Sequence, residues 1–104
     1  MIPLVSIIIP CYNSAGTLKK TLESACMQSW RHLEVIVVDD GSSDASADAA
    51  KSYPDSRVRL IRSRKRGACR ARNIGLHVAK RDYIQVVDAD DLIEGNKIKS
   101  QIEA

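Results

Sequence analysis

The chain has 104 residues, of which 44% are hydrophobic and 28% are charged, and its formal net charge is +3. This composition excludes a disordered polypeptide and indicates one small globular domain or a part of a larger one. No apolar run approaches the roughly 20 residues that span a bilayer, and the first ten residues lack the basic region of a signal peptide.

Along the first half of the chain, continuous apolar runs alternate with helical spacings. The run VSIII at 5–9 and the run EVIVV at 34–38 are typical of strands that are buried on both faces. Between them, over 15–29, apolar residues recur every three to four positions, which predicts a helix. A second helix is expected over roughly 45–53, with a serine or aspartate of the preceding turn as its N-cap.

The second half continues this alternation. RVRLI at 57–61 alternates in polarity like a half-exposed edge strand, and the apolar positions over 71–78 predict a third helix. YIQVV at 83–87 is a fourth buried strand. Three strand–helix repeats followed by a strand predict a Rossmann-like α/β fold, with a parallel sheet of about four strands and right-handed crossovers.

Two further patterns concern cysteine and charge. Cys11, Cys26 and Cys69 are odd in number and lack CxxC spacing, which favours free thiols in a reducing, cytoplasmic compartment and argues against zinc. Residues 57–72 hold eight arginines and lysines but no aromatic residue that could stack on bases, so no nucleic-acid partner is predicted. A solvated surface and a site for an anionic phosphate both remain open for this run.

Polar clusters follow three of the four predicted strands: PCYNS, DDGSSD and DADD. Ligands of such sheets bind beyond the carboxyl ends of the strands, so these clusters are expected to meet in one crevice. Asp88 and Asp90 lie two positions apart, so their side chains point the same way, about 7 Å apart along the strand. They could share a hard divalent cation, Mg²⁺ or Mn²⁺. Capping of the next helix is the alternative, chiefly for Asp91.

The other strand ends narrow the ligand class. Asp39 and Asp40 could accept hydrogen bonds from a base or a ribose, although a simple Asx turn is the alternative. The first strand end has only Gly16 where a dinucleotide site needs G-x-G-x-x-G, which excludes an ordinary dehydrogenase. Arg72, near the start of the third predicted helix, could contact a phosphate.

Together, VSIIIPCYN, EVIVVDDGSSD, ARNIGL and YIQVVDADD resemble the motifs of the inverting family-2 glycosyltransferases in their order and spacing. The resemblance implies the GT-A fold, with strand order 3-2-1-4, and makes 1–104 the nucleotide-sugar (donor) binding part of a glycosyltransferase domain. The acceptor-binding part and the catalytic base are expected beyond residue 104, so this chain alone is expected to transfer no sugar. One departure is Gly95, where the family commonly has proline.

The resemblance also implies roles for individual residues. Pro10 and Tyr12 would border the nucleotide base, and Asp40 would bind the base through an N–H, with uracil expected. Arg72 would lie beside the nucleotide.

Two acids complete the implied site. Asp88 would contact the ribose or the metal, and Asp90 would coordinate the Mn²⁺ or Mg²⁺ that bridges the diphosphate. The implied partners are a nucleoside-diphosphate sugar, expected to be a UDP-sugar, and an acceptor sugar that is lipid-linked or part of a polysaccharide. The reaction would be inverting transfer to a hydroxyl of that acceptor. The implied location is cytoplasmic, with peripheral attachment at the inner face of the membrane as an option.

Two other functional classes compete with this one. A non-catalytic module that only binds nucleotide sugars fits the same residues. A phospho-receiver domain also has an acidic pair at a strand end, but that pair follows the first strand, whereas here it follows the second. The receiver reading is therefore disfavoured.

The last expectation concerns association. In the implied strand order, residues 83–87 form an edge with the composition of a central strand, which predicts a homo-oligomer. The alternative is that the C-terminal segment folds back as a helix and covers the sheet with Leu92, Ile93, Ile98 and Ile102.

Overall fold

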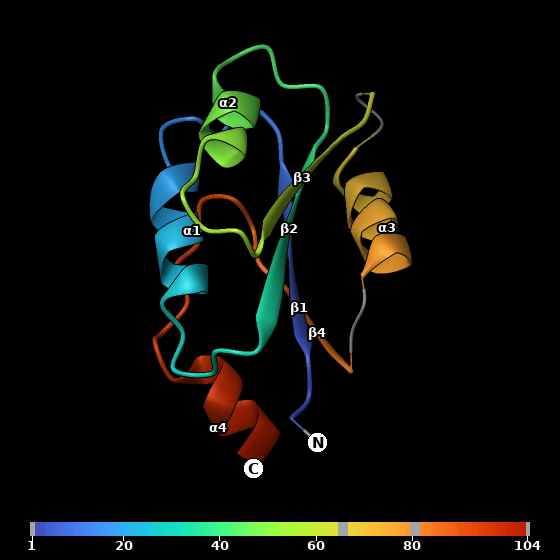
Figure 1. The fold of residues 1–104 in the computed structure, drawn as a ribbon. Helices are drawn as coiled ribbons and strands as arrows, with labels where there is room; N and C mark the ends of the chain where they lie inside the picture. Colours follow the sequence, from blue (N-terminus) through green and yellow to red (C-terminus); the bar gives the residue numbers. More distant parts are fainter. Residues whose placement is uncertain (1, 65–66, 80–81, 104) are drawn as a thin grey trace.

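A four-stranded parallel sheet forms the centre of the computed structural model (Figure 1), which describes residues 2–64, 67–79 and 82–103. In sheet order the strands are β3, β2, β1 and β4. This order and the α/β class confirm the predicted fold. The strand bounds are β1 Val5–Cys11, β2 Leu33–Asp39, β3 Val58–Arg62 and β4 Tyr83–Val86.

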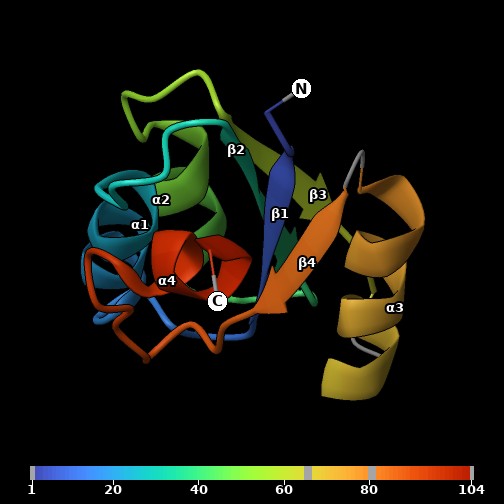
Figure 2. The ribbon, with the colours of Figure 1, turned by 90° about the horizontal axis from the view of Figure 1, so that it is seen from below.

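Helices cover both faces of the sheet. Helices α1, α2 and α4 lie on one face and α3 lies on the other (Figure 2). Their bounds are α1 Leu18–Cys26, α2 Ser46–Lys51, α3 Ala68–Val78 and α4 Lys97–Glu103. Both α1 and α2 are shorter than predicted. Before α1 the chain forms a turn, in which the Ser14 carbonyl accepts the N–H groups of Thr17 and Leu18.

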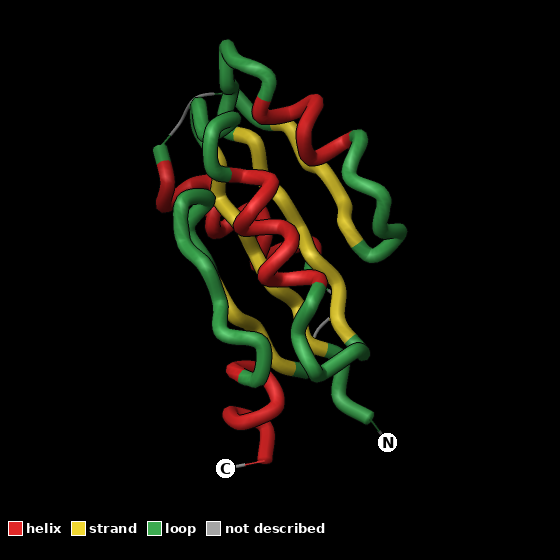
Figure 3. The backbone as a smooth tube through the Cα atoms, turned by 90° about the vertical axis from the view of Figure 1, so that its left-hand side faces the viewer, coloured by secondary structure: helices red, strands yellow, loops and turns green. Residues whose placement is uncertain are grey.

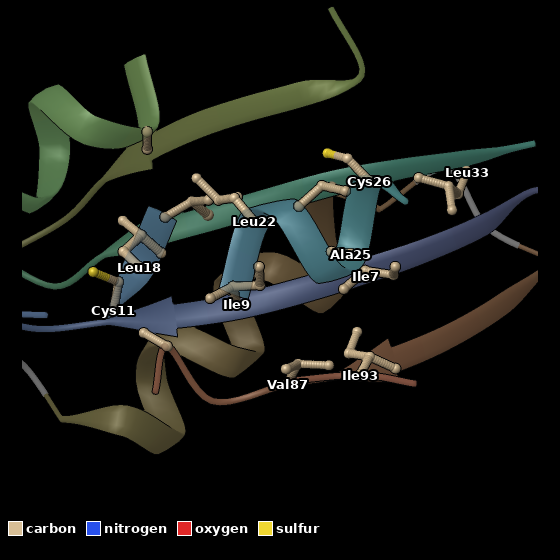
Figure 4. Packing of buried hydrophobic residues seen from close by; sticks show 14 of the residues in the cluster. Ile7, Ile9, Cys11, Leu18, Leu22, Ala25, Cys26, Leu33, Val87 and Ile93 are labelled. Carbon is tan, nitrogen blue, oxygen red and sulfur yellow. The ribbon is translucent and has the colours of Figure 1, made fainter. Parts of the chain in front are cut away.

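The core is centred on β1, which pairs with β2 on one side and with β4 on the other. Because both edges and both faces of β1 are covered, Ile7, Ile8 and Ile9 are fully buried. The larger hydrophobic cluster lies between the sheet and the α1 side (Figure 4). The smaller cluster lies under α3 and contains Ile36 and Val38.

Helix α3 approaches the sheet closely at a glycine. A Cβ atom added to Gly75 would overlap the side chain of Ile8 on β1. The absence of a side chain at this helical position therefore sets the distance between α3 and the sheet, and with it the position of the N-terminus of α3 beside the strand ends.

The C-terminal segment folds back on the α1 side, near the end of the sheet where the strands begin (Figure 3). Ile93 and Ile98 are buried, Ile102 packs partly against the core, and Leu92 remains 69% exposed. Three of the four residues predicted to cover the sheet thus do so, and Leu92 does not. The C-terminal segment covers a face of the sheet, whereas β4 remains an edge strand among the described residues.

A buried glutamine ties this segment to α1. The Gln28 side chain donates to the Glu94 carbonyl at 2.7 Å and accepts the N–H of Ile98 at 3.2 Å. Gln28 is fully buried, so the loss of either bond would destabilise the fold, because an unpaired buried amide group is costly. In the part of the chain that is described, no helix is both long and apolar enough to cross a bilayer.

Candidate functional site

A small cavity of about 100 Å³ lies beyond the carboxyl ends of β1, β2 and β4. It is lined by Pro10, Cys11, Tyr12, Asp40, Ala71 and Asp88. Four of the six residues that the sequence singled out are therefore brought together, from three different strand ends. The fifth, Asp90, follows Asp88 by two positions. Cys11 and Ala71 were not predicted, because small apolar side chains carry no chemical signal of their own.

The loop that carries Tyr12 is fastened to the loop after β2. Asn13 has a φ of 48°, and its N–H donates to the Ser42 hydroxyl at 2.8 Å. In return, the Asn13 side-chain oxygen accepts the N–H of Ser43 at 2.8 Å. These two bonds place the Tyr12 ring, which is 41% exposed, at the mouth of the cavity.

Asp44 supplies a second connection between the same loops. Its carboxylate accepts the N–H of Ala15 at 3.1 Å and the N–H of Ser46 at 2.9 Å, as well as the Ser46 hydroxyl. Hydrogen bonds from Ser46 hold the pKa of Asp44 below its usual value. Asp44 thus accepts the first N–H of α2 and also fixes the loop before α1, although the N-cap position itself is occupied by Ala45 and not by the predicted serine or aspartate.

The two acids at the end of β2 have different surroundings. Asp39 is fully buried, and its carboxylate accepts the Ser42 hydroxyl and lies 3.5 Å from Nε of Arg62. Asp40 lines the cavity. Asp39 is not among the residues that line it. The structure assigns that place to Asp40, the residue that the sequence comparison with the family had selected.

Asp40 is held by the segment between β3 and α3. One carboxylate oxygen accepts the Ser63 hydroxyl at 3.2 Å, and the other accepts the N–H of Gly67 at 2.9 Å. Gly67 has a φ of 97°, which favours glycine strongly. Sequence reasoning missed Ser63 entirely. A glycine directly before a predicted helix was the one feature of the sequence that could have indicated the contact between Gly67 and Asp40.

The acidic turn after β4 presents three carboxylates on one side. Asp88, Asp90 and Asp91 are exposed, and each has a carboxylate oxygen within 4.8 Å of the others. The buried residues Val87 and Ala89 alternate with them. Exposed carboxylate oxygens at this spacing fit the few-carboxylate, water-completed coordination of Mg²⁺ or Mn²⁺.

Helix α1 supports this turn from behind. The Ala89 carbonyl accepts the hydroxyls of both Thr17 and Thr21, each at 2.9 Å. These bonds join positions that are about 70 residues apart in the chain, so sequence patterns offered no sign of them. They fix the backbone between Asp88 and Asp90, which keeps both carboxylates directed toward solvent at the cavity edge.

Arg72 lies one position after the cavity residue Ala71, on the exposed side of α3. Its guanidinium lies 3.2 Å from the sulfur of Cys69, and the side chain is not among those that line the cavity. Its contact with a nucleotide stays a prediction. The cysteines are free, as predicted: Cys11 and Cys26 are buried and Cys69 is exposed. Burial raises the pKa of the Cys11 thiol, so this cavity residue is a neutral group.

Comparison with known families settles the class of protein. The model of glycosyl transferase family 2 matches residues 6–104. The chain belongs to this family. Glycosyltransferase GlyG of Streptococcus pneumoniae is 38% identical over 96% of this chain and 34% of its own length. The Escherichia coli UDP-Glc:alpha-D-GlcNAc-diphosphoundecaprenol beta-1,3-glucosyltransferase WfaP is 42% identical over 95% of this chain and 40% of its own.

Two solved structures agree with the fold. Staphylococcus aureus TarS in complex with UDP-GlcNAc superposes with a TM-score of 0.83 at 30% identity, over 95% of this chain and 30% of TarS. The Pyrobaculum calidifontis mannosyltransferase PcManGT, in complex with GDP-Man and Mn²⁺, has a TM-score of 0.79 at 32% identity, over 88% of this chain and 29% of its own. The chain thus spans about a third of the length of the family-2 proteins that it matches.

Proposed function

We propose that this chain is the donor-binding part of an inverting glycosyltransferase that uses a UDP-sugar and a divalent metal. The observation that carries the proposal is the convergence of Tyr12, Asp40 and Asp88 on one cavity at the strand ends. The family membership supports the transferase class, and the nucleotide-sugar complexes of TarS and the mannosyltransferase support the ligand class.

In the proposed complex each residue has a separate task. Asp40, fixed through Ser63 and Gly67, would accept an N–H of the base, and Pro10 and Tyr12 would flank the ring. Asp88 would contact the ribose or the metal, and Asp90 would bind the metal. A divalent ion held by these residues would supply positive charge for the diphosphate.

Uracil is the proposed base, although the solved structures that resemble this chain contain different nucleotides. TarS is solved with UDP-GlcNAc, and the mannosyltransferase is solved with GDP-Man. The acceptor is proposed to be a lipid-linked or polysaccharide sugar, supported by WfaP, whose name specifies a diphosphoundecaprenol acceptor. The catalytic base is expected outside this chain, so binding rather than turnover is the useful measurement.

Calorimetric titration with UDP, with and without Mn²⁺, tests the proposal. We expect Mn²⁺-dependent binding that Asp90→Ala weakens at least about tenfold, or roughly 1.4 kcal/mol. Asp48→Ala, which removes an exposed carboxylate from α2, is the matched control and should leave affinity unchanged. Equal affinity of the Asp90 variant and the parent chain would refute the metal assignment. Tighter binding of GDP than of UDP would refute the choice of base.

A further inference from the structure

The basic residues of this chain are concentrated in one segment. Residues 56–81 hold ten of the 16 lysines and arginines and none of the 13 acidic residues. This segment therefore carries a formal charge of +10, and the remainder of the chain, with six basic and 13 acidic residues, carries −7. The modest net charge of the whole chain conceals this separation.

The described part of this segment, residues 56–64 and 67–79, contains six of the ten basic residues, of which Arg57 and Arg62 are paired with Asp55 and Asp39. It comprises β3, at one edge of the sheet, and α3, which alone among the described helices covers its face (Figure 2). We call the surface formed by Arg59, Arg64 and Arg70 the basic face. The side chain of Arg59 is 45% exposed although it pairs with Glu34 at 3.6 Å, and Arg64 and Arg70 are exposed. Among the described residues, no carboxylate pairs with Arg64 or Arg70.

A shallow apolar groove adjoins the basic face. Its volume is about 310 Å³, which exceeds that of the donor cavity, and it is lined by Arg70, Asn73, Ile74, His77 and Val78 of α3. Ile74 and Val78 are only half-buried, and they pack against the smaller core cluster. The groove therefore offers apolar contact directly beside an unpaired arginine.

Three anionic partners fit the charge, and the structure distinguishes among them. A single-stranded nucleic acid would need aromatic side chains for stacking, and residues 56–81 contain none. The diphosphate of a donor would bind at the cavity, which Arg64 and Arg70 do not line. An anionic lipid surface can contact several arginines at once and can also accept half-buried apolar side chains.

We infer that the basic face docks on an anionic lipid bilayer. The inference rests on the placement of charge and not on the proposed transfer reaction. Docking through α3 would bring the donor cavity close to the membrane, because Ala71 of the same helix lines that cavity and Gly67 directly before it holds Asp40. An acceptor carried by a lipid would then approach the donor from the docked side.

Vesicle co-sedimentation of the full chain tests the inference. We expect binding to phosphatidylcholine vesicles that contain about one-third phosphatidylglycerol, and none to phosphatidylcholine alone. Each arginine at such a surface strengthens binding by about fivefold, so Arg64→Gln with Arg70→Gln should weaken it by roughly 25-fold. Raising the NaCl concentration from about 0.1 M to about 0.5 M should also release the chain.

The matched control removes the same charge from the other side. Lys19 and Lys20 are exposed on α1, so Lys19→Gln with Lys20→Gln should bind vesicles like the parent chain. Circular dichroism and UDP titration would check that each variant is folded. The inference fails if binding does not depend on the anionic lipid or if both double variants lose the same affinity. It also fails if a single-stranded oligonucleotide binds the chain more tightly than the vesicles do.

Discussion

At the scale of single residues, the carboxylates of the site differ in burial, and the difference suits their proposed roles. Asp40 is 4% exposed and is held by two hydrogen-bond donors, as expected of a carboxylate that accepts a hydrogen bond from a base. Asp88 and Asp90 are exposed, as a metal site completed by water and diphosphate requires. Acids of similar chemistry thus differ in their surroundings in the way that their proposed roles would require.

Gly67 provides a residue-scale prediction. Its φ of 97° with a ψ of 159° strains any other residue by about 1 to 3 kcal/mol. We expect Gly67→Ala to displace the N–H that Asp40 accepts and to lower UDP affinity about fivefold to tenfold by calorimetry, about 1 to 1.4 kcal/mol. Gly95→Ala, at a glycine with open space around it, is the control. Unchanged UDP affinity of the Gly67 variant would show that this contact does not position Asp40.

At the scale of elements, the packing of α3 on β1 controls where the site components lie. The helix begins beside Asp40 and runs back over Ile8, against which Gly75 packs without a side chain. Helix α1 has the corresponding role for the acidic turn, through Thr17 and Thr21. The cavity is thus held from both faces of the sheet.

Gly75→Ala is expected to destabilise the chain even though alanine favours helices over glycine by about 1 kcal/mol. The added methyl group overlaps Ile8, and such overpacking costs typically about 1 to 3 kcal/mol. Urea unfolding should show a net loss of up to about 2 kcal/mol, whereas Gly16→Ala, with open space around it, should change little. Combination with Ile8→Ala should be less than additive, and strict additivity would contradict the overlap.

A half-buried ion pair just before β3 is connected to the end of α1. Arg57 pairs with Asp55 at 2.8 Å and donates to the carbonyl groups of Cys26 and Arg31. Hydrogen bonds from Arg57 hold the pKa of Asp55 well below its usual value. Because the pKa is lower in the folded state, the stabilisation is complete above the unfolded pKa of about 4 and is lost as the pH falls below it.

Asp55→Ala therefore has a pH-dependent effect. At pH 7 we expect the free energy of unfolding to fall by about 1 to 3 kcal/mol, since a hydrogen-bonded charged group is removed. The difference from the parent chain should shrink steadily below about pH 4, where Asp55 becomes protonated in the unfolded state. Urea titrations at several pH values measure this difference. A constant difference from pH 7 down to pH 2 would exclude the ion pair as its source.

At the scale of the whole molecule, helices cover both faces of the sheet, and β3 and β4 are its edges among the described residues. The segment with Ile93 and Ile98 covers the α1 side, so the apolar face there is buried. The outer edge of β4 has no partner strand among the described residues, and Tyr83 on it is 51% exposed. Charged residues and prolines, which usually protect such edges, are absent from β4.

We predict that the 104-residue chain self-associates through β4 at micromolar concentration. Light scattering should give a mass above that of the monomer, and Tyr83→Lys should reduce it by placing a charge on the edge. Lys is a common protective residue at edges, so the variant should remain folded by circular dichroism. A monomer mass for the parent chain would refute this prediction.

The local patterns of the sequence determined the strands, their parallel arrangement and the family. Buried parallel strands need continuous apolar runs, and helices between them need a period near 3.6, so both are visible without the fold. The family resemblance singled out Pro10, Tyr12, Asp40 and Asp88. The polar clusters after three of the strands predicted that such residues would meet, because parallel strands end at the same edge.

Only the tertiary structure decided what supports those residues. Ser63 and Gly67 beneath Asp40, and Thr17 and Thr21 beneath the acidic turn, act through hydrogen bonds between distant parts of the chain. The same holds for the folded-back segment, where Ile93 is buried and its neighbour Leu92 is not. Periodicity reports which residues share a face of one element, whereas these contacts depend on how separate elements pack, which no local pattern records.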